Sequence, residues 1–161
     1  MAYSPVPGLM LAIKALAESA LPEFDVRIGK PKDSSTRFLA IGVDSPFDDT
    51  LRGVSVTGNW AGSGATAGSA SPRELRGDIR CVLWVENGDD DMEQAMSDAS
   101  DAMDALIVAW SPDPSLGVAN VGSTLIDADT APEFWSDTDL GAVWVQVFSF
   151  SFYAYLSGVI A

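Results

Sequence analysis

The stretch Val-Trp-Val-Gln-Val-Phe-Ser-Phe-Ser-Phe-Tyr-Ala-Tyr at residues 143–155 decides the fold, and it lies within residues 140–161, which carry no charged side chain. β-Branched and aromatic residues dominate it, which is typical of a strand. Successive side chains of a strand point to opposite faces, so two apolar sets are expected. One set is Trp144, Phe148, Phe150 and Phe152, and the other is Val143, Val145, Val147, Tyr153 and Tyr155. Because both faces are apolar over the first half, we expect a central strand, with helices on one face and loops or another subunit on the other.

A segment of this length without charge is also long enough to cross a membrane as a helix. Its apolar character is interrupted by the polar residues Gln146, Ser149, Ser151 and Ser157. No basic residue flanks either end to anchor it at a membrane surface. We therefore interpret it as a long buried strand. At the N-terminus, Lys14 and Glu18 interrupt the nearest apolar run, so the sequence does not favour a secretory signal.

The rest of the chain alternates between short apolar segments and turn residues. Helical spacing relates Leu9, Ile13, Leu16 and Ala20, and Pro22 ends the helix that they predict. Strands are predicted at residues 24–28, 38–43, 51–57, 74–85 and 121–128, and an acidic loop runs from there through Asp139. Residues 58–71 are rich in Gly, Ala and Ser around Trp60, which predicts a long loop that becomes ordered against a neighbouring chain.

Residues 74–85 have the alternation of a half-buried strand. One predicted face carries Leu75, Ile79, Cys81, Leu83 and Val85. The other carries Arg76, Asp78 and Arg80. Cys81 is the single cysteine of the chain, so it forms no intramolecular disulfide, and we expect an inert thiol in the core.

Residues 92–110 form the clearest predicted helix. Asn87, Gly88 and the acids at 89–91 supply a turn and an N-terminal cap, where negative charge favours the positive end of the helix dipole. The expected core-facing stripe consists of Met92, Met96, Ala99, Met103, Leu106, Ile107 and Trp110. The opposite arc carries the acids Glu93, Asp98, Asp101 and Asp104. No Lys or Arg at i+4 offsets their repulsion, so this arc is either a solvated helix surface or a surface that repels another anion.

These elements predict one α+β domain over residues 1–161. Their order is α-β-β-β-β-α-β-β, which gives a mainly antiparallel β-sheet with two helices. A chain of 161 residues with 47% hydrophobic content is long enough to bury a core without a disulfide or a metal.

Charge is divided unevenly along the chain. The nine Lys and Arg residues all lie in the first eighty positions, where they balance nine acids, and the second half supplies the whole net charge of −14. Neutralising phosphates takes Lys and Arg, so the composition of the second half argues against a protein that reads DNA and against a membrane-surface protein. A wall past which DNA moves without adhering fits this composition.

Catalytic and cofactor motifs are not found in the sequence. There is no histidine, which excludes Ser/His/Asp and Cys/His arrangements and most transition-metal sites. Gly62, Gly64 and Gly68 have the wrong spacing for a dinucleotide fingerprint, and Gly29-Lys30 lacks the other residues of a phosphate loop. We therefore expect no enzyme activity, no cofactor and no metal.

Carboxylate clusters leave two alternatives open. The acids at 89–91 lack the spacing and the glycine of a calcium loop, which favours helix capping. Five acids cluster later, namely Asp127, Asp129, Glu133, Asp137 and Asp139. A hard cation is one interpretation of this second group, and solvated surface acids are the preferred one. A hydrolase that uses paired carboxylates is a further alternative, but no acid stands out from its neighbours.

Several segments of the sequence follow one another in an order that is typical of a known protein family. An N-terminal amphipathic helix runs into Leu21-Pro22 and then into the phrase Val26-Arg27-Ile28-Gly29-Lys30-Pro31. A strand through residues 77–85 leads to the Ala-rich helix at 92–110 and to Asp113-Pro114-Ser115-Leu116-Gly117. The last strand ends in Phe152, Tyr153 and Tyr155. Over nearly its whole length, the chain resembles the tail terminator proteins of long-tailed bacteriophages.

The resemblance implies a structural virion protein, made in the bacterial host cytoplasm and located at the head-proximal end of the tail. It implies a homohexameric ring that caps the tail tube and contacts the tail tube protein and the neck or head-completion proteins. We expect the acids Glu93, Asp98, Asp101 and Asp104 to line the DNA channel. Subunit or tube contacts are expected from Trp60, Arg73, Arg76 and Arg80.

Two alternatives to a tail terminator remain. One is a neck or head-closure protein of the phage connector, which needs the same passage for DNA. The other is an acidic protein that mimics DNA and binds a basic partner, with steep salt dependence.

Overall fold

The structure, a computed structural model, describes residues 5–30, 35–43, 53–58, 73–128 and 131–156. Within these residues two helices, α1 (Val6–Ala20) and α2 (Met92–Trp110), accompany seven strands. The strands are β1 (Asp25–Ile28), β2 (Arg37–Ile41), β3 (Val54–Gly58), β4 (Arg73–Asn87), β5 (Val121–Asp127), β6 (Glu133–Asp137) and β7 (Gly141–Leu156). The predicted α+β class and its order of elements are confirmed, and β6 is an additional strand.

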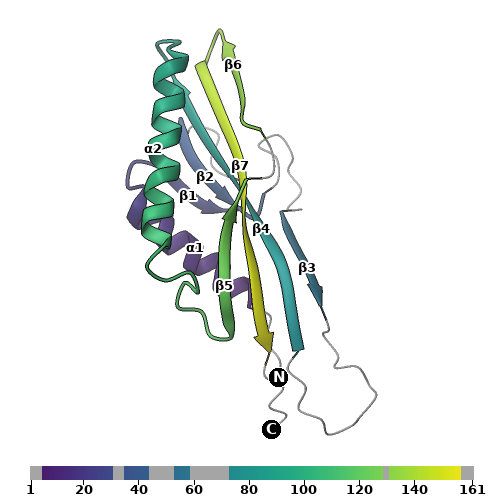
Figure 1. The fold of residues 1–161 in the computed structure, drawn as a ribbon. Coiled ribbons are helices and arrows are strands. Elements are labelled where there is room, and N and C mark those ends of the chain that lie inside the picture. Colours follow the sequence, from purple (N-terminus) through teal and green to yellow (C-terminus); the bar gives the residue numbers. More distant parts are fainter. Residues whose placement is uncertain (1–4, 31–34, 44–52, 59–72, 129–130, 157–161) are drawn as a thin grey trace, which may run out of the picture.

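All seven strands belong to one sheet, with the order β1-β2-β4-β7-β5 (Figure 1). β3 adds to β4, and β6 adds to β7. Only β1 and β2 pair in parallel among the described strands, so the sheet is mainly antiparallel as expected. β4 and β7 pair from Arg73 opposite Leu156 to Asn87 opposite Ala142. Because β7 has β4 on one side and β5 and β6 on the other, its predicted central position is confirmed.

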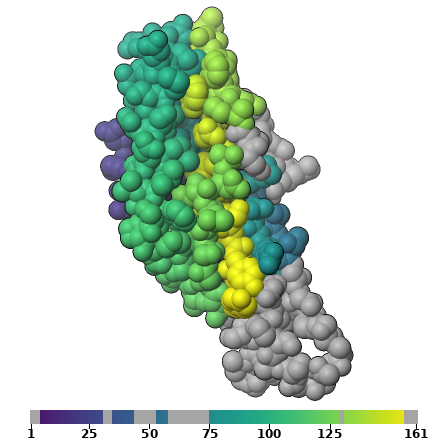
Figure 2. Space-filling view, in the orientation of Figure 1, coloured from purple at the N-terminus to yellow at the C-terminus, as the bar shows by residue number. Residues whose placement is uncertain are grey.

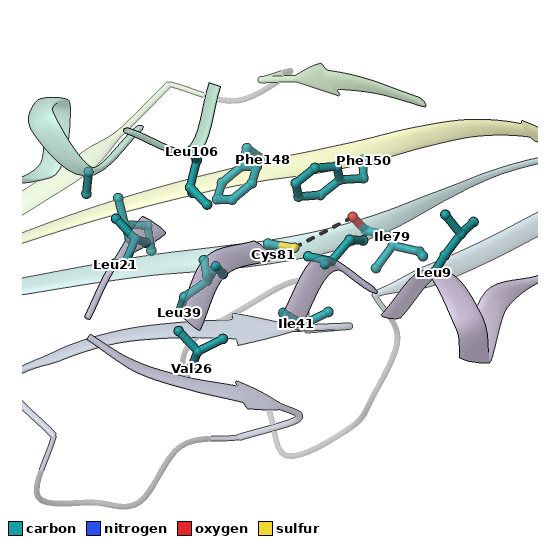
Figure 3. Close-up of a cluster of buried hydrophobic side chains, with 14 of the residues drawn as sticks. Leu9, Leu21, Val26, Leu39, Ile41, Ile79, Cys81, Leu106, Phe148 and Phe150 are labelled. Carbon is teal, nitrogen blue, oxygen red and sulfur yellow. Dashed lines mark hydrogen bonds between the residues drawn. The ribbon is translucent and has the colours of Figure 1, made fainter. Parts of the chain in front are cut away.

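Both helices lie on one face of the sheet (Figure 1), and the main core fills the space between the two layers. α1 contributes Leu9 and Ile13. Its C-cap is Leu21, whose N–H donates to the Ala17 carbonyl just before Pro22. Figure 3 shows side chains of α1, β2, β4 and β7 meeting in this layer. Most inward residues predicted for the two long strands are buried here, namely Leu75, Ile79, Cys81, Leu83 and Val85 of β4 and Phe148, Phe150 and Phe152 of β7. Trp144, the remaining member of the predicted set, is partly buried against this core.

A second apolar cluster lies on the opposite face of the sheet. Its buried members are Phe38, Ala40, Val43, Val82, Trp84, Val143 and Val145, and Trp135 and Val147 pack against them. The rings of Phe38 and Trp84 stack with centroids 5.5 Å apart, and Trp135 meets Trp84 edge-on at 5.5 Å. The alternating valines at the start of β7 are therefore buried on this face, as the sequence predicts.

The core-facing stripe of α2 differs from the prediction. Its buried residues are Ala95, Ala99, Ala102 and Leu106. Met96 is 44% exposed and Ile107 is 42% exposed, although both were expected to face the core. Alanines at the centre of the stripe let the helix approach the sheet closely, and the larger side chains then lie along its flank. The prediction placed the stripe too far toward the methionines.

The predicted acidic loop after β5 contains the strand β6. It pairs with the start of β7, from Glu133 opposite Val145 to Asp137 opposite Gly141. Aromatic neighbours hold it in place, because Phe134 stacks on Trp144 and Trp135 contacts Trp84. Two acids at the ends of this five-residue segment concealed the strand in the sequence.

Residues 140–161 were interpreted as a strand rather than a membrane-spanning helix, and the described part of them forms β7. No helix among the described residues is long and apolar enough to cross a membrane. The predicted loop at residues 58–71 lies outside the described residues apart from Gly58, which ends β3.

Candidate functional site

The turn before α2 is built as the sequence predicts. Asp91 is the N-cap residue, and its Oδ1 accepts a hydrogen bond from the Gln94 N–H at 3.1 Å. The Asn87 side chain accepts from the Asp89 N–H at 2.9 Å, and Asp90 takes a positive φ of 57°. Among the described residues no group of three or more Asp, Glu, His or Cys side chains is arranged to hold a metal ion. These contacts confirm capping as the role of Asp91.

The four predicted channel acids of α2 have different environments. Glu93, Asp101 and Asp104 are exposed. Within the described part of the chain, these three carboxylates make no hydrogen bond or ion pair. Asp98 is the exception, since its side chain is only 17% exposed. The exposed side of α2 therefore carries three acids without a described cationic partner, and we call Glu93, Asp101 and Asp104 the acidic face.

Asp98 connects α2 to the sheet. The Arg37 guanidinium of β2 donates to Asp98 Oδ2 at 2.7 Å, and the Gln94 amide donates to Asp98 Oδ1 at 2.7 Å. Arg37 also lies 3.7 Å from a carboxylate oxygen of Glu23. A charge-assisted bond in a partly buried setting is stronger than a solvated one. Asp98 is thus the least accessible of the four acids.

Two hollows border α2, one on each side. The first, of about 280 Å³, lies toward α1 and is lined by Ala20, Leu21, Pro22, Glu23, Phe24, Arg37, Asp98, Asp101, Ala102 and Ala105. The second, of about 210 Å³, lies toward β7 and is lined by Ala99, Ser100, Met103, Asp104, Trp144 and Gln146. Asp101 and Asp104 therefore stand at the rims of different hollows.

The predicted contact residues of β4 lie on the sheet face away from the helices. Arg76 and Arg80 alternate with Leu75, Ile79 and Cys81, which are buried in the main core. The Arg76 guanidinium lies over the Tyr153 ring, 5.2 Å from its centroid. Arg80 is half-buried and has an interaction partner. Next to Arg76, Ser151 donates to Asp78 at 2.7 Å.

The side chains of the other two predicted contact residues lie outside the described part of the structure. Arg73 is the first residue of β4, but its side chain lies outside the described part of the structure. Trp60 lies outside the described residues altogether.

The later acids are spread over several elements. Asp127 ends β5, Glu133 begins β6 and Asp137 ends β6, while Asp129 lies outside the described residues. Asp137 has a structural role, because its Oδ1 accepts from the N–H groups of Asp139 at 2.8 Å and Leu140 at 3.3 Å. That arrangement closes the turn into β7 and resembles the side-chain capping of other tight turns.

Cys81 is fully buried in the main core, as predicted. Its thiol donates to the Ile79 carbonyl at 3.9 Å (Figure 3). Burial raises the pKa of this thiol, because a thiolate loses its hydration in the core, and a backbone hydrogen bond at Gly42 opposes this only in part. The predicted inert thiol fits this environment, since the thiolate is the reactive form.

Two features of this surface did not follow from the sequence. Phe134 is 59% exposed and stacks on Trp144, with ring centroids 5.2 Å apart and planes 11° from parallel. Arg37 pairs with Asp98 across the sheet–helix interface. The alternation of apolar residues predicts which face of each element is buried, but these two contacts depend on how the elements pack against one another.

No protein-family model matches the chain, and no curated protein matches it. The surfaces described above and the layout of the sequence are therefore the features that bear on function.

Proposed function

We propose that this chain is the subunit of a homohexameric ring that caps the tail tube of a long-tailed bacteriophage. In this proposal the ring joins the tail tube protein to the head-side neck proteins, and its acidic surface permits DNA to pass. The observation that carries the proposal is the acidic face of α2, whose three carboxylates have no described cationic partner. The layout of the sequence, which resembles that of tail terminator proteins, supports the same function.

In the proposal the acidic face keeps DNA from adhering to the channel wall. Each contact between a Lys or Arg and a DNA phosphate releases counterions and adds salt-dependent affinity, which would hold DNA against a channel wall. No Lys, Arg or His follows Arg80 in the sequence, so α2, β5, β6 and β7 bring no basic side chain to such a wall. A surface that carries only negative charges repels the phosphate backbone over roughly a Debye length.

A closed ring also needs two different surfaces that fit each other, because head-to-tail contacts are heterologous. Arg76 lies on the sheet face opposite to the helices, and the acidic face belongs to a helix on the other side. Opposite charge favours a contact between successive copies, in which an acid at the edge of the acidic face meets the basic surface while the other acids line the channel. In the proposal Arg73, Arg76 and Arg80 of one copy meet acids of the neighbouring copy.

Two other functions use the same acids differently. A neck or head-closure protein would also line a DNA passage, and it would be found with head-side components rather than on isolated tail tubes. A DNA mimic would bind a basic protein and need not associate with itself. Exposed apolar side chains on the helical side, such as Phe134 and Val108, favour association over mimicry, because large apolar groups are enriched where proteins meet.

Native mass spectrometry of the purified chain, with and without tail tubes, tests the proposed function. We expect a ring of six identical subunits, either free or assembled on a tube end. Electron microscopy of the tube-bound ring should then place Glu93 and Asp101 on the channel surface. A chain that stays monomeric in both states would contradict the ring, and acids on the ring exterior would contradict the channel.

The alternatives are separated in the same samples. Capture on isolated head connectors instead of tubes would favour the neck protein. Tight binding to a basic DNA-binding protein, with a steep loss between 50 and 200 mM salt as expected for phosphate-like contacts, would favour the DNA mimic.

A further inference from the structure

The hollow between α2 and β7 combines aromatic, thioether and carboxylate groups. Its volume is about 210 Å³, and its walls include Met103, Asp104 and Trp144. Phe134 stacks on the Trp144 ring and extends the aromatic surface outward. Figure 2 shows the first part of β7, in yellow, reaching the surface between α2 and β6. We call this hollow the Trp144 hollow.

The indole ring and the carboxylate of the Trp144 hollow favour the binding of a planar cation. An indole ring attracts a cation over its face, and this attraction is strongest where water is excluded. Asp104 supplies a carboxylate at the rim, and the lining includes no basic residue. A guanidinium satisfies both groups at once, because its plane stacks on a ring while its N–H groups donate to a carboxylate.

Most described basic side chains already have a carboxylate or another partner. Lys14 pairs with Glu18, Arg27 with Asp25, and Arg37 with Asp98. Lys30 and Arg80 also have partners.

Arg76 differs, because within the described part of the structure its guanidinium contacts the Tyr153 ring and makes no side-chain hydrogen bond or ion pair. A ring face does not use the N–H donors at the guanidinium edge, and among the described residues no carboxylate accepts from them.

Arg76 and the Trp144 hollow lie on opposite sides of the same sheet. Arg76 alternates along β4 with the core residues Leu75 and Ile79, whereas the hollow opens beside a helix that covers the core face. A side chain does not reach through the sheet, so the Arg76 that occupies the hollow belongs to another copy. This geometry is the heterologous one that a ring requires.

We propose that the Trp144 hollow of one copy receives the Arg76 guanidinium of the next, which stacks on Trp144 and donates to Asp104. The inference rests on the proposed function, since it names a contact within the ring. It assigns Asp104 to the subunit interface and leaves Glu93 and Asp101 for the channel.

A charge exchange tests this contact. Arg76→Glu and Asp104→Arg each place like charges together, and each should lower the association constant by roughly tenfold or more. The double variant restores opposite charges and should return the constant to within a factor of about three of the original protein. Lys14→Glu and Glu93→Arg are matched controls, because they change surface charges outside the contact and should leave association within a factor of about three. Sedimentation velocity measures association, and circular dichroism checks that each variant is folded.

A cross-linking pair gives a second test that does not depend on charge. A variant with Arg76→Cys and Asp104→Cys, treated in the assembled state with a short bismaleimide, should give a ladder of covalent oligomers. A linker is used because the Arg76 side chain spans more than the distance between the Cα atoms of a disulfide. Arg76→Cys with Glu93→Cys should not form this ladder. Cross-linking of the first pair alone supports the contact, and cross-linking of the second pair alone overturns it.

The outcomes separate this inference from the proposed function. A ring that forms in the original protein and persists in both single charge variants overturns the Arg76 contact, while the proposed function stands. A chain that is monomeric both free and with tail tubes overturns both. Loss of the ring in each single variant and its recovery in the double variant supports the contact.

Discussion

The Arg37 guanidinium of β2 donates to Asp98 of α2 at 2.7 Å, so one ion pair joins the sheet to the helix that carries the acidic face. Arg37 is 33% exposed and Asp98 is 17% exposed. The pair is therefore less screened by water than an ion pair on a helix surface. It links α2, which packs on β4 and β7, to β2, and it removes one of the four predicted channel acids from open solvent.

Replacing Arg37 with Ala should destabilise the protein. The change leaves Asp98 half-buried with only the Gln94 amide as a described donor. The loss should be about 1–3 kcal/mol, between the values for exposed and buried ion pairs. Urea denaturation measures it, with Lys14→Ala as the control, since that residue pairs with Glu18 on the exposed surface of α1 and should cost less than about 0.5 kcal/mol. Equal losses for the two variants would contradict the structural role of Arg37.

The sequence predicted the faces of β4 and β7 because a period of two is unambiguous when one face is apolar. It did not reveal that Arg37 meets Asp98, because that contact depends on how β2 and α2 pack together and not on the pattern of either element. The stripe of α2 was displaced for a related reason. Large side chains such as Met96 dominate a hydrophobic pattern, whereas close packing against a sheet selected the alanines.

The candidate surface was predictable in part. The sequence identified the acids of α2, because their positions follow from the helical period alone. It gave no indication of the Trp144 hollow, since Phe134 lies in a segment whose acids predicted a loop, and its stacking on Trp144 requires β6 to form. Strand pairing is a long-range property, and so the sites that depend on it are the least visible in a sequence.

The corrected stripe of α2 predicts opposite outcomes for two neighbouring apolar residues. Leu106 is fully buried, so Leu106→Ala should leave a cavity and cost about 2–5 kcal/mol. Val108 is 70% exposed, so Val108→Ala should change the free energy of unfolding by less than about 0.5 kcal/mol. Thermal unfolding of both variants checks the assignment, and a large loss for Val108→Ala would mean that α2 is rotated from its described position.

Gly77 in β4 allows close packing that no other residue permits. A Cβ at this position would lie 2.2 Å from the Ser55 carbonyl oxygen and 2.7 Å from the Phe152 ring. Gly77→Ala should therefore displace β3 from β4 and cost about 1–3 kcal/mol. Gly88→Ala is the matched control, because a Cβ there meets nothing within 4 Å, and it should be neutral or stabilising by up to about 1 kcal/mol. Tolerance of Gly77→Ala in chemical denaturation would contradict the pairing of β3 with β4.

Thr124 joins the end of α2 to β5. Its hydroxyl donates to the Pro114 carbonyl at 2.6 Å and accepts from the Trp110 indole N–H at 2.8 Å. Thr124→Val keeps the shape but removes both bonds, so it should cost about 1–3 kcal/mol. Thr124→Ser keeps the hydroxyl and should recover most of that loss. If Thr124→Ser and Thr124→Val were equally destabilised in urea, the methyl group rather than the hydroxyl would be responsible.

Cys81 should be protected from thiol reagents in the folded protein and reactive once it unfolds. The thiol is fully buried, so labelling with a chromogenic disulfide reagent at pH 8 should proceed only through unfolding, at a rate that rises with urea. Rapid labelling without denaturant would contradict the position of Cys81 in the core.

The same burial predicts how stability depends on pH. The pKa of the Cys81 thiol is raised in the folded state, whereas in the unfolded chain a cysteine thiol has a pKa of about 8.5. Above that pH the folded state holds a proton that the unfolded state has lost, so the stability from this group falls as pH rises, by at most about 1.4 kcal/mol per pH unit. Below about pH 8 the contribution is constant. Cys81→Ala lacks this group, so the difference in unfolding free energy between the original protein and the variant should shrink from pH 8 to pH 10. A difference that stays constant over that range would mean that the thiol is not buried.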